Sequence, residues 1–117
     1  MNISIKATGH TLTEETRELV EGKFAKLEKL CGEGAKLSCE IEESIAAVRA
    51  GGRYRAEGNL NVAGKLYRAE ATHETLEGAI DQVRDDLVRE VRTAHSRTRR
   101  LAKRGGALMK RLMRFGR

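Results

Sequence analysis

The sequence predicts an α+β domain of two layers, in which a four-stranded sheet carries both helices on one face. Apolar and polar residues alternate in four short segments, as they do in half-buried strands. In two longer segments apolar residues recur every three or four positions, as in amphipathic helices. The segments follow one another in the order β-α-β-β-β-α. Each has a single apolar face, so two packed layers bury all of them most simply.

The first strand is predicted over residues 2–8 and the first helix over residues 14–31. Thr13 is a favourable N-cap, and the two glutamates that follow it complement the positive end of the helix dipole. Gly32 and Gly34 end the helix by supplying a permissive backbone. The apolar stripe of this helix consists of Thr16, Val20, Phe24, Leu27 and Cys31.

Three further strands follow, and glycine-containing turns separate them. The turns are predicted at Ala50-Gly51-Gly52 and Ala63-Gly64-Lys65. Short connections of this kind favour antiparallel hairpins. The three strands are predicted over residues 36–42, 53–62 and 67–72.

The second helix is predicted from about residue 74 to about Arg104, where Gly105-Gly106 is expected to stop it. The chain is thus divided into an α+β domain over residues 1–104 and a short basic tail over residues 105–117. The apolar stripe of the second helix consists of Leu76, Ile80, Val83, Leu87, Val91, Ala94, Thr98 and Leu101.

Length and composition restrict the class of protein. With 117 residues the chain is long enough for one hydrophobic core and too short for two. No apolar run reaches the ~20 residues of a membrane helix, and the N-terminal residues lack the apolar region of a signal peptide. We therefore expect a cytoplasmic protein, in which Cys31 and Cys39 are reduced and buried.

Basic residues are concentrated at the C-terminal end of the sequence. Up to Glu90 there are 13 basic and 17 acidic residues, whereas after Glu90 there are ten basic residues and no acidic one. A nearly neutral body with a concentrated basic end predicts a polyanionic partner, with nucleic acid first and an anionic membrane second.

No motif for catalysis or metal binding appears in the sequence. Neighbouring acidic residues, such as Glu42-Glu43 and Asp85-Asp86, cannot face one another across a cleft, and we interpret them as solvated surface. We expect a protein that is not an enzyme and needs no metal or cofactor. The three histidines, predicted at a turn, a strand end and a helix, are His10, His73 and His95.

The basic residues of the two helices are predicted to flank one groove. With Val91 at the centre of the apolar stripe, helical periodicity places basic residues on the opposite face of the second helix. Arginine on such a face can bind successive phosphates bidentately. A plain solvated helix is the alternative, because acids near its start and bases near its end also complement the helix dipole. The predicted polyanion-binding residues are Lys23, Lys26, Lys29, Arg89, Arg92, Arg97, Arg99, Arg100, Lys103 and Arg104.

Aromatic residues are scarce, which narrows the mode of binding. The chain has no tryptophan, and Phe24, Tyr54 and Tyr67 fall at inward positions. Domains that read single-stranded bases need exposed aromatic side chains for stacking. The sequence therefore favours recognition of RNA shape and phosphates over recognition of bases.

Several stretches resemble a known family. Residues 12–17 (LTEETR) and residues 23–30 (KFAKLEKL) resemble the first helix of the ribosome hibernation-promoting factors. These are also called ribosome-associated inhibitor A or sigma-54 modulation proteins. Ala79-Ile80-Asp81, with Leu87 and Arg89, resembles the start of their second helix. The resemblance covers about residues 1–104, in the same order of elements.

The resemblance implies a fold similar to double-stranded-RNA-binding domains and a partner, the small ribosomal subunit with its 16S-type rRNA. Members of the family occupy the mRNA and tRNA channel, block the A and P sites, and keep idle ribosomes intact. By resemblance, Lys23, Lys26 and Arg89 match basic positions that face ribosomal RNA. Long members carry a C-terminal dimerisation domain. Because residues 105–117 are too few for one, we expect a monomer off the ribosome.

The sequence departs from the family at two positions, and two other functions remain open. Glu77 stands where an aromatic residue is common, and Asp86 stands where a lysine is common.

One alternative is a general structured-RNA-binding module without preference for ribosomes. The other is a peripheral membrane protein that uses residues 107–117 as an interfacial helix.

Overall fold

The computed structural model describes residues 1–9, 11–43, 49 and 51–115, with side chains as far as Thr98 in the last helix. The predicted order of elements is confirmed, while His10 and Ala50 lie outside the described residues. The elements are β1 (Asn2–Thr8), α1 (Glu14–Cys31), β2 (Lys36–Glu43), β3 (Tyr54–Val62), β4 (Lys65–His73) and α3 (Leu76–Phe115).

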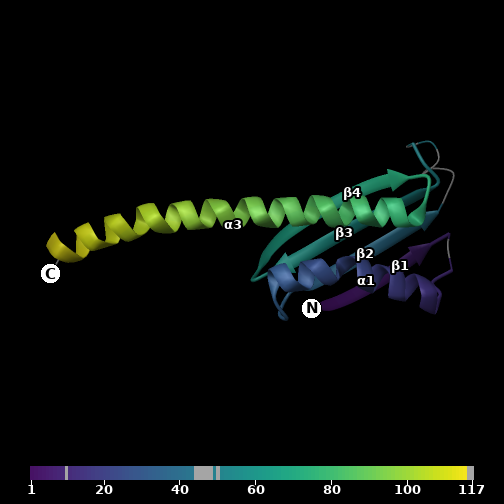
Figure 1. Cartoon of the computed structure of the whole chain (residues 1–117), viewed down its shortest axis with the longest axis horizontal. Coiled ribbons are helices and arrows are strands. Elements are labelled where there is room, and N and C mark those ends of the chain that lie inside the picture. Colours follow the sequence, from purple (N-terminus) through teal and green to yellow (C-terminus); the bar gives the residue numbers. More distant parts are fainter. Residues whose placement is uncertain (10, 44–48, 50, 116–117) are drawn as a thin grey trace.

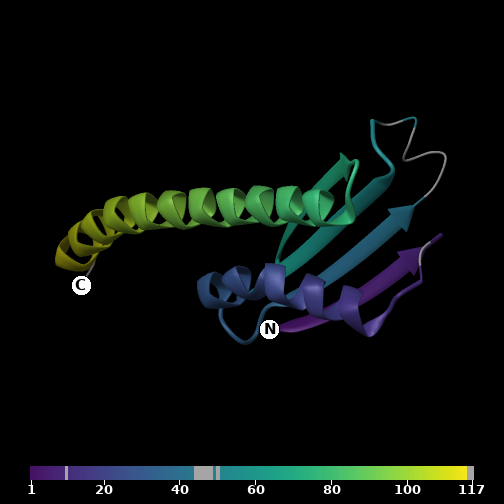
Figure 2. The ribbon, with the colours of Figure 1, turned by 45° about the vertical axis from the view of Figure 1, so that its right-hand side comes forward.

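The four strands form one mixed sheet in the order β1-β2-β3-β4. β1 pairs with β2 in parallel, because α1 crosses over between them, and the other two pairs are antiparallel. Both helices pack on the same side of the sheet (Figures 1 and 2). This two-layer arrangement confirms the predicted fold class.

β3 and β4 are joined by a two-residue hairpin turn, Ala63-Gly64, which lies within the turn predicted at Ala63-Gly64-Lys65. Ala63 and Gly64 both have positive φ angles, of 51° and 83°, as the twist of a tight hairpin requires. The side-chain oxygen of Asn61 accepts a hydrogen bond from the Gly64 amide at 3.2 Å. The turn therefore places β4 directly beside β3 at the edge of the sheet.

The ends of α1 follow the predicted capping. The Thr13 hydroxyl accepts a hydrogen bond from the Thr16 amide at 3.2 Å. At the other end Gly32 takes a φ of 86°, and its amide donates to the Glu28 carbonyl at 2.9 Å. α3 begins in the same way as α1, because the Thr75 hydroxyl accepts from the Gly78 amide at 3.0 Å.

The core lies between the helices and the inner face of the sheet. Phe24 and Leu27 of α1 and Ile80 of α3 are fully buried, and they pack against inward residues of β2 and β3. Helix α3 crosses β3 at Gly58, where an added Cβ would lie 2.9 Å from Val83 Cγ1. The helix thus sits so close to the sheet that only glycine fits there without rearrangement.

The two cysteines are free thiols, as predicted. Cys39 is buried in the core, and burial, helped by the charge of neighbouring Glu40, raises the pKa of its thiol to about 12. Cys31 is half-buried at the end of α1, and burial also raises the pKa of its thiol. Both side chains are therefore protonated at neutral pH.

The prediction that α3 ends near Arg104 is wrong. The helix continues through Gly105 and Gly106 to Phe115, giving 40 residues, and the molecule extends over 64 Å along its longest axis. Figure 1 shows α3 crossing the sheet and then projecting beyond it. Each glycine costs an interior helical position about 1 kcal/mol relative to alanine, but it does not forbid the helix. Strong helix formers flank the pair on both sides, and no proline interrupts them.

Candidate nucleic-acid interface

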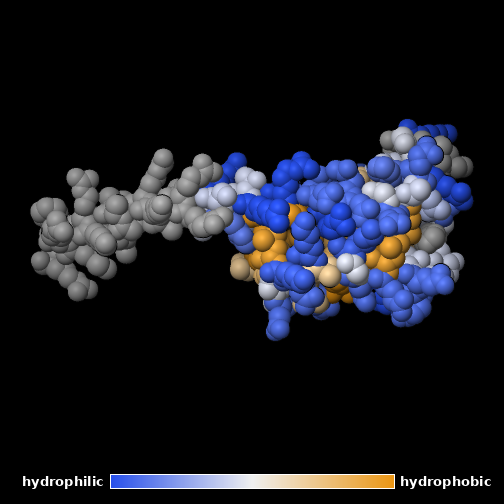
Figure 3. Space-filling view, in the orientation of Figure 1, coloured by the Kyte–Doolittle hydropathy of each residue, from blue (hydrophilic) through white to orange (hydrophobic). Residues whose placement is uncertain are grey.

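An open groove of about 590 Å³ lies between α1 and α3. Lys26 lines it from α1, and Arg89 and Arg92 line it from α3. Figure 3 shows this side of the molecule, where hydrophilic residues predominate and hydrophobic surface is confined to patches along the line between the helices. Packing of the two helices on one sheet face thus brings together basic residues that are far apart in the sequence.

Lys23 is paired with acidic residues of α3, although the sequence placed it among the RNA-binding residues. Its ammonium nitrogen lies 2.8 Å from Glu77 Oε1 and 3.0 Å from Asp81 Oδ1. These hydrogen bonds, first with Glu77 and then with Asp81, raise the pKa of Lys23. The Lys23 ammonium therefore links α1 to the N-terminal part of α3. It also gives Glu77, one of the two departures from the family pattern, a structural partner.

Arg89 is exposed and only partly neutralised. Its Nη2 donates to Asp86 Oδ1 at 2.8 Å, and the Arg89 side chain remains 72% exposed. The same Asp86 oxygen accepts from Gln82 Nε2 at 3.0 Å. A guanidinium has five N–H donors, so Arg89 keeps donors for a phosphate while Asp86 holds its orientation.

Lys26 and Arg92 are the least engaged cations of the groove. Both are exposed, and neither forms an ion pair within the described part of the chain. Lys29 lies exposed in the last turn of α1, and the groove lining does not include it. Lys26 and Arg92 are therefore the unpaired cations of a groove whose lining also includes Asp85, which is itself paired with Arg84.

A second groove, of about 320 Å³, lies on the other flank of α3, against β4. Arg97 lines it together with Arg89, and Lys65 and Tyr67 line it from β4. The sequence analysis did not select Lys65 or Tyr67 for this surface. The alternation of β4 places both on the helix side of the sheet, but periodicity alone does not say which flank of a helix lies above an edge strand.

The remaining predicted residues follow along α3. Their backbone is helical, which extends the basic segment as a continuous helix. Their side chains lie outside the described residues. Helical periodicity predicts that Arg99 and Lys103 lie on the face opposite the apolar stripe and that Arg100 and Arg104 lie on a neighbouring stripe, and this stays a prediction. These residues are Arg99, Arg100, Lys103 and Arg104.

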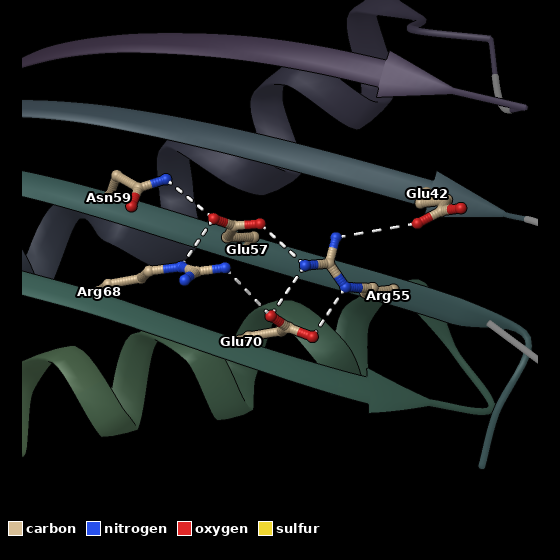
Figure 4. A network of polar contacts seen from close by, with 6 residues as sticks. All are labelled: Glu42, Arg55, Glu57, Asn59, Arg68 and Glu70. Carbon is tan, nitrogen blue, oxygen red and sulfur yellow. Dashed lines mark hydrogen bonds and ion pairs between the residues drawn. The ribbon is translucent and has the colours of Figure 1, made fainter. Parts of the chain in front are cut away.

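The opposite face of the sheet carries a network of paired charges (Figure 4). Arg55 lies at its centre: Nε donates to Glu70 at 2.9 Å, and Nη2 donates to Glu57 at 2.8 Å. Arg68 donates to Glu57 at 2.9 Å and lies 3.4 Å from Glu70. Glu42, which the sequence analysis interpreted as solvated surface, lies 3.8 Å from Arg55 and is half-buried.

These contacts neutralise the open face of the sheet. Hydrogen bonds from Arg55 hold the pKa of Glu57 and of Glu70 below its usual value. The same bonds, that to Glu70 first, raise the pKa of Arg55. Arg55, Glu57 and Glu70 are therefore charged and compensate one another at neutral pH. Among the described residues, the charges of β3 and β4 on the open face are thus largely paired, whereas Lys26 and Arg92 on the helix side are not.

Two other kinds of site are not found within the described residues. No three histidine, cysteine or acidic side chains there are grouped so that they could hold a metal ion. No helix in that part of the chain is sufficiently apolar over a sufficient length to cross a membrane.

Two solved structures with similar folds come from Thermus thermophilus and Coxiella burnetii. The N-terminal domain of Protein Y from Thermus thermophilus superimposes with a TM-score of 0.67 at 26% identity, covering 78% of this chain and 96% of that domain. A ribosomal subunit interface protein from Coxiella burnetii gives a TM-score of 0.66 at 14% identity, covering 82% of this chain and 99% of the other, and so supports the fold alone.

The sequence comparisons identify a family. No curated protein matches this sequence. The model of the family described as sigma 54 modulation protein / S30EA ribosomal protein matches residues 3–99, which include all four strands and the groove-lining part of α3. Its members are ribosome-associated regulators of translation and are not enzymes. From this match and the shared fold, the chain belongs to the sigma 54 modulation protein / S30EA ribosomal protein family.

Proposed function

We propose that this protein binds the small ribosomal subunit by placing the groove between α1 and α3 against ribosomal RNA in the mRNA and tRNA channel. There it blocks the A and P sites and holds idle ribosomes inactive. The observation that carries this proposal is the convergence of Lys26, Arg89 and Arg92 on one open groove, in a chain that belongs to a ribosome-associated family.

The physical basis is electrostatic docking. RNA presents regularly spaced phosphates, and a protein that neutralises several of them releases condensed counterions. Arg89 and Arg92 lie three residues apart on α3, nearly one turn of the helix, and Lys26 reaches the same groove from α1. Because the charges of β3 and β4 on the open sheet face are paired with one another, while Lys26 and Arg92 are unpaired, we place the helix side toward RNA.

Inhibition of translation then requires only that the protein occupies the channel. A protein lodged in the channel through which mRNA and tRNA pass excludes both by its volume, and no covalent step is involved. This agrees with the absence of a metal-binding cluster among the described residues and with a family whose members are not enzymes.

Co-sedimentation with purified small and large subunits through a sucrose gradient tests the proposal. We expect the wild-type protein to travel with the small subunit. Lys26→Gln/Arg92→Gln should bind at least tenfold more weakly and should fail to inhibit a cell-free translation extract. The matched control is Lys6→Gln/Lys36→Gln, which removes the same charge from exposed positions of β1 and β2 and should behave as wild type.

Three outcomes contradict the proposal. Equal loss in the two double variants means that net charge alone matters. Binding only to the large subunit places the protein elsewhere on the ribosome. Equally tight binding to an unrelated RNA hairpin of similar length identifies a general structured-RNA-binding module, the alternative that the sequence left open.

A further inference from the structure

The groove between α3 and β4 differs in chemistry from the groove between α1 and α3. It is lined by Lys65 and Tyr67 of β4 and by Arg89, Glu90, Thr93 and Arg97 of α3. Its lining combines three cations, one carboxylate, one hydroxyl and one aromatic ring. Figures 1 and 2 show α3 crossing the face of the sheet that β3 and β4 form. Both grooves combine three cations with one carboxylate and with hydroxyl groups, so the ring of Tyr67 is the group that sets this groove apart.

The cations of this groove are available to an anionic ligand. Lys65 and Arg97 are exposed, and neither forms an ion pair within the described residues. The Lys65 ammonium lies 5.3 Å from the centre of the Tyr67 ring, a cation–π contact that is weak at an exposed site. This lysine can therefore leave the ring and follow a phosphate without disturbing the fold.

The ring of Tyr67 supplies a surface for a nucleobase. Tyr67 is half-buried, which fixes its ring beside the groove. An unstacked base gains more from stacking on such a ring than an exposed lysine does from its cation–π contact. The nearby Glu90 carboxylate is exposed and can accept a hydrogen bond from an exocyclic amino group of the base.

Arg89 connects the two grooves, because it lines both of them. We propose that the groove between α3 and β4 binds one unpaired nucleotide of the RNA whose backbone occupies the groove between α1 and α3. Arg89 contacts the phosphate between the two grooves, Arg97 and Lys65 contact the phosphates of the unpaired nucleotide, and its base lies against Tyr67. This inference rests on the proposed function and specifies the kind of RNA, one with a nucleotide extruded from its helix.

The first test counts phosphate contacts. The affinity for purified small subunits is measured over a salt series for wild type, Lys65→Ala/Arg97→Ala and the matched control Lys6→Ala/Lys36→Ala. Loss of two contacts to a single strand should reduce the slope of log affinity against log salt by about 1.4, and the control should keep the wild-type slope. Equal slopes for the two variants overturn the second groove as an RNA site.

The second test separates base from phosphate. Tyr67→Phe keeps the ring and should bind within about twofold of wild type. Tyr67→Leu keeps apolar bulk without the ring and should bind roughly 5- to 100-fold more weakly, the range expected for loss of one stacked base. Thermal midpoints show whether each variant is folded. If the slope changes in the first test but Tyr67→Leu binds normally, the groove binds phosphate alone and the nucleotide site is wrong.

A third measurement is independent of the ribosome. Fluorescein-labelled hexacytidylate at low salt is the single-stranded probe, followed by anisotropy, with a blunt RNA duplex as competitor. We expect Tyr67→Leu and Lys65→Ala/Arg97→Ala to lose affinity for the hexanucleotide, while Lys26→Gln/Arg92→Gln loses more affinity for the duplex. If small subunits are not bound but this pattern holds, the proposed function fails and the nucleotide site stands. If subunits are bound and the pattern is absent, only the nucleotide site fails.

Discussion

At the scale of single residues, Lys23 and Lys26 lie one turn apart on α1 and have different surroundings. Lys23 is bonded to Glu77 and Asp81, whereas Lys26 lines the open groove. We expect Lys23→Met to lower the thermal midpoint, because it leaves two carboxylates of α3 without their cation, and to change ribosome affinity little. Lys26→Met should leave the midpoint unchanged and weaken binding. Thermal unfolding and subunit binding, measured for both variants, test this prediction. A larger loss of binding in Lys23→Met than in Lys26→Met would contradict it.

The hydrogen bonds of Arg55 predict how the thermal stability of the protein depends on pH in the acid range. Its hydrogen bonds hold the pKa of Glu57 and of Glu70 below the ordinary value of 4.5. Because the folded pKa values are the lower ones, this stabilisation is complete above about pH 4.5 and is lost as pH falls through them. The thermal midpoint of Arg55→Met should therefore be lower than that of wild type at pH 7 and should fall less between about pH 5 and pH 3. If the thermal midpoints of the two proteins fall equally with pH, the charge network does not contribute to stability in this way.

At the scale of elements, two glycines with opposite surroundings predict opposite effects of the same substitution. Gly22 is exposed in the middle of α1, and an added Cβ there meets nothing within 4 Å. Gly22→Ala should stabilise the protein by about 0.5–1 kcal/mol, because alanine loses less backbone entropy in a helix. Gly58→Ala should destabilise it by about 1–3 kcal/mol, because its Cβ would lie 2.9 Å from Val83 Cγ1. Urea unfolding measures both, and stabilisation by Gly58→Ala would contradict the close approach of α3 to β3.

At the scale of the whole molecule, the two ends of α3 are expected to have different roles, one in folding and the other in binding RNA. Among the side chains described in α3, the last fully buried one is that of Val91, and the helix continues to Phe115. We propose that residues 1–104 fold as a unit and that residues 105–117 extend its RNA-binding surface. Deleting residues 105–117 should leave the thermal midpoint within about 2 °C, weaken subunit binding, and reduce the salt slope because four basic residues are removed. A collapse of the midpoint would show that this segment stabilises the domain.

The sequence by itself determined the elements, their caps and the charged end of the molecule, because these depend on residues only a few positions apart. Thr13 caps α1 through the amide three residues later, and the apolar stripe of α3 follows from helical periodicity. The end of α3 was misjudged, since Gly105-Gly106 weakens a helix without stopping it. The tertiary structure decided which charges remain unpaired. Glu77 neutralises Lys23 across two helices, and Tyr67 of the edge strand β4 lines the same groove as Arg97 of α3. Such contacts join residues far apart in the chain, and no local pattern specifies them.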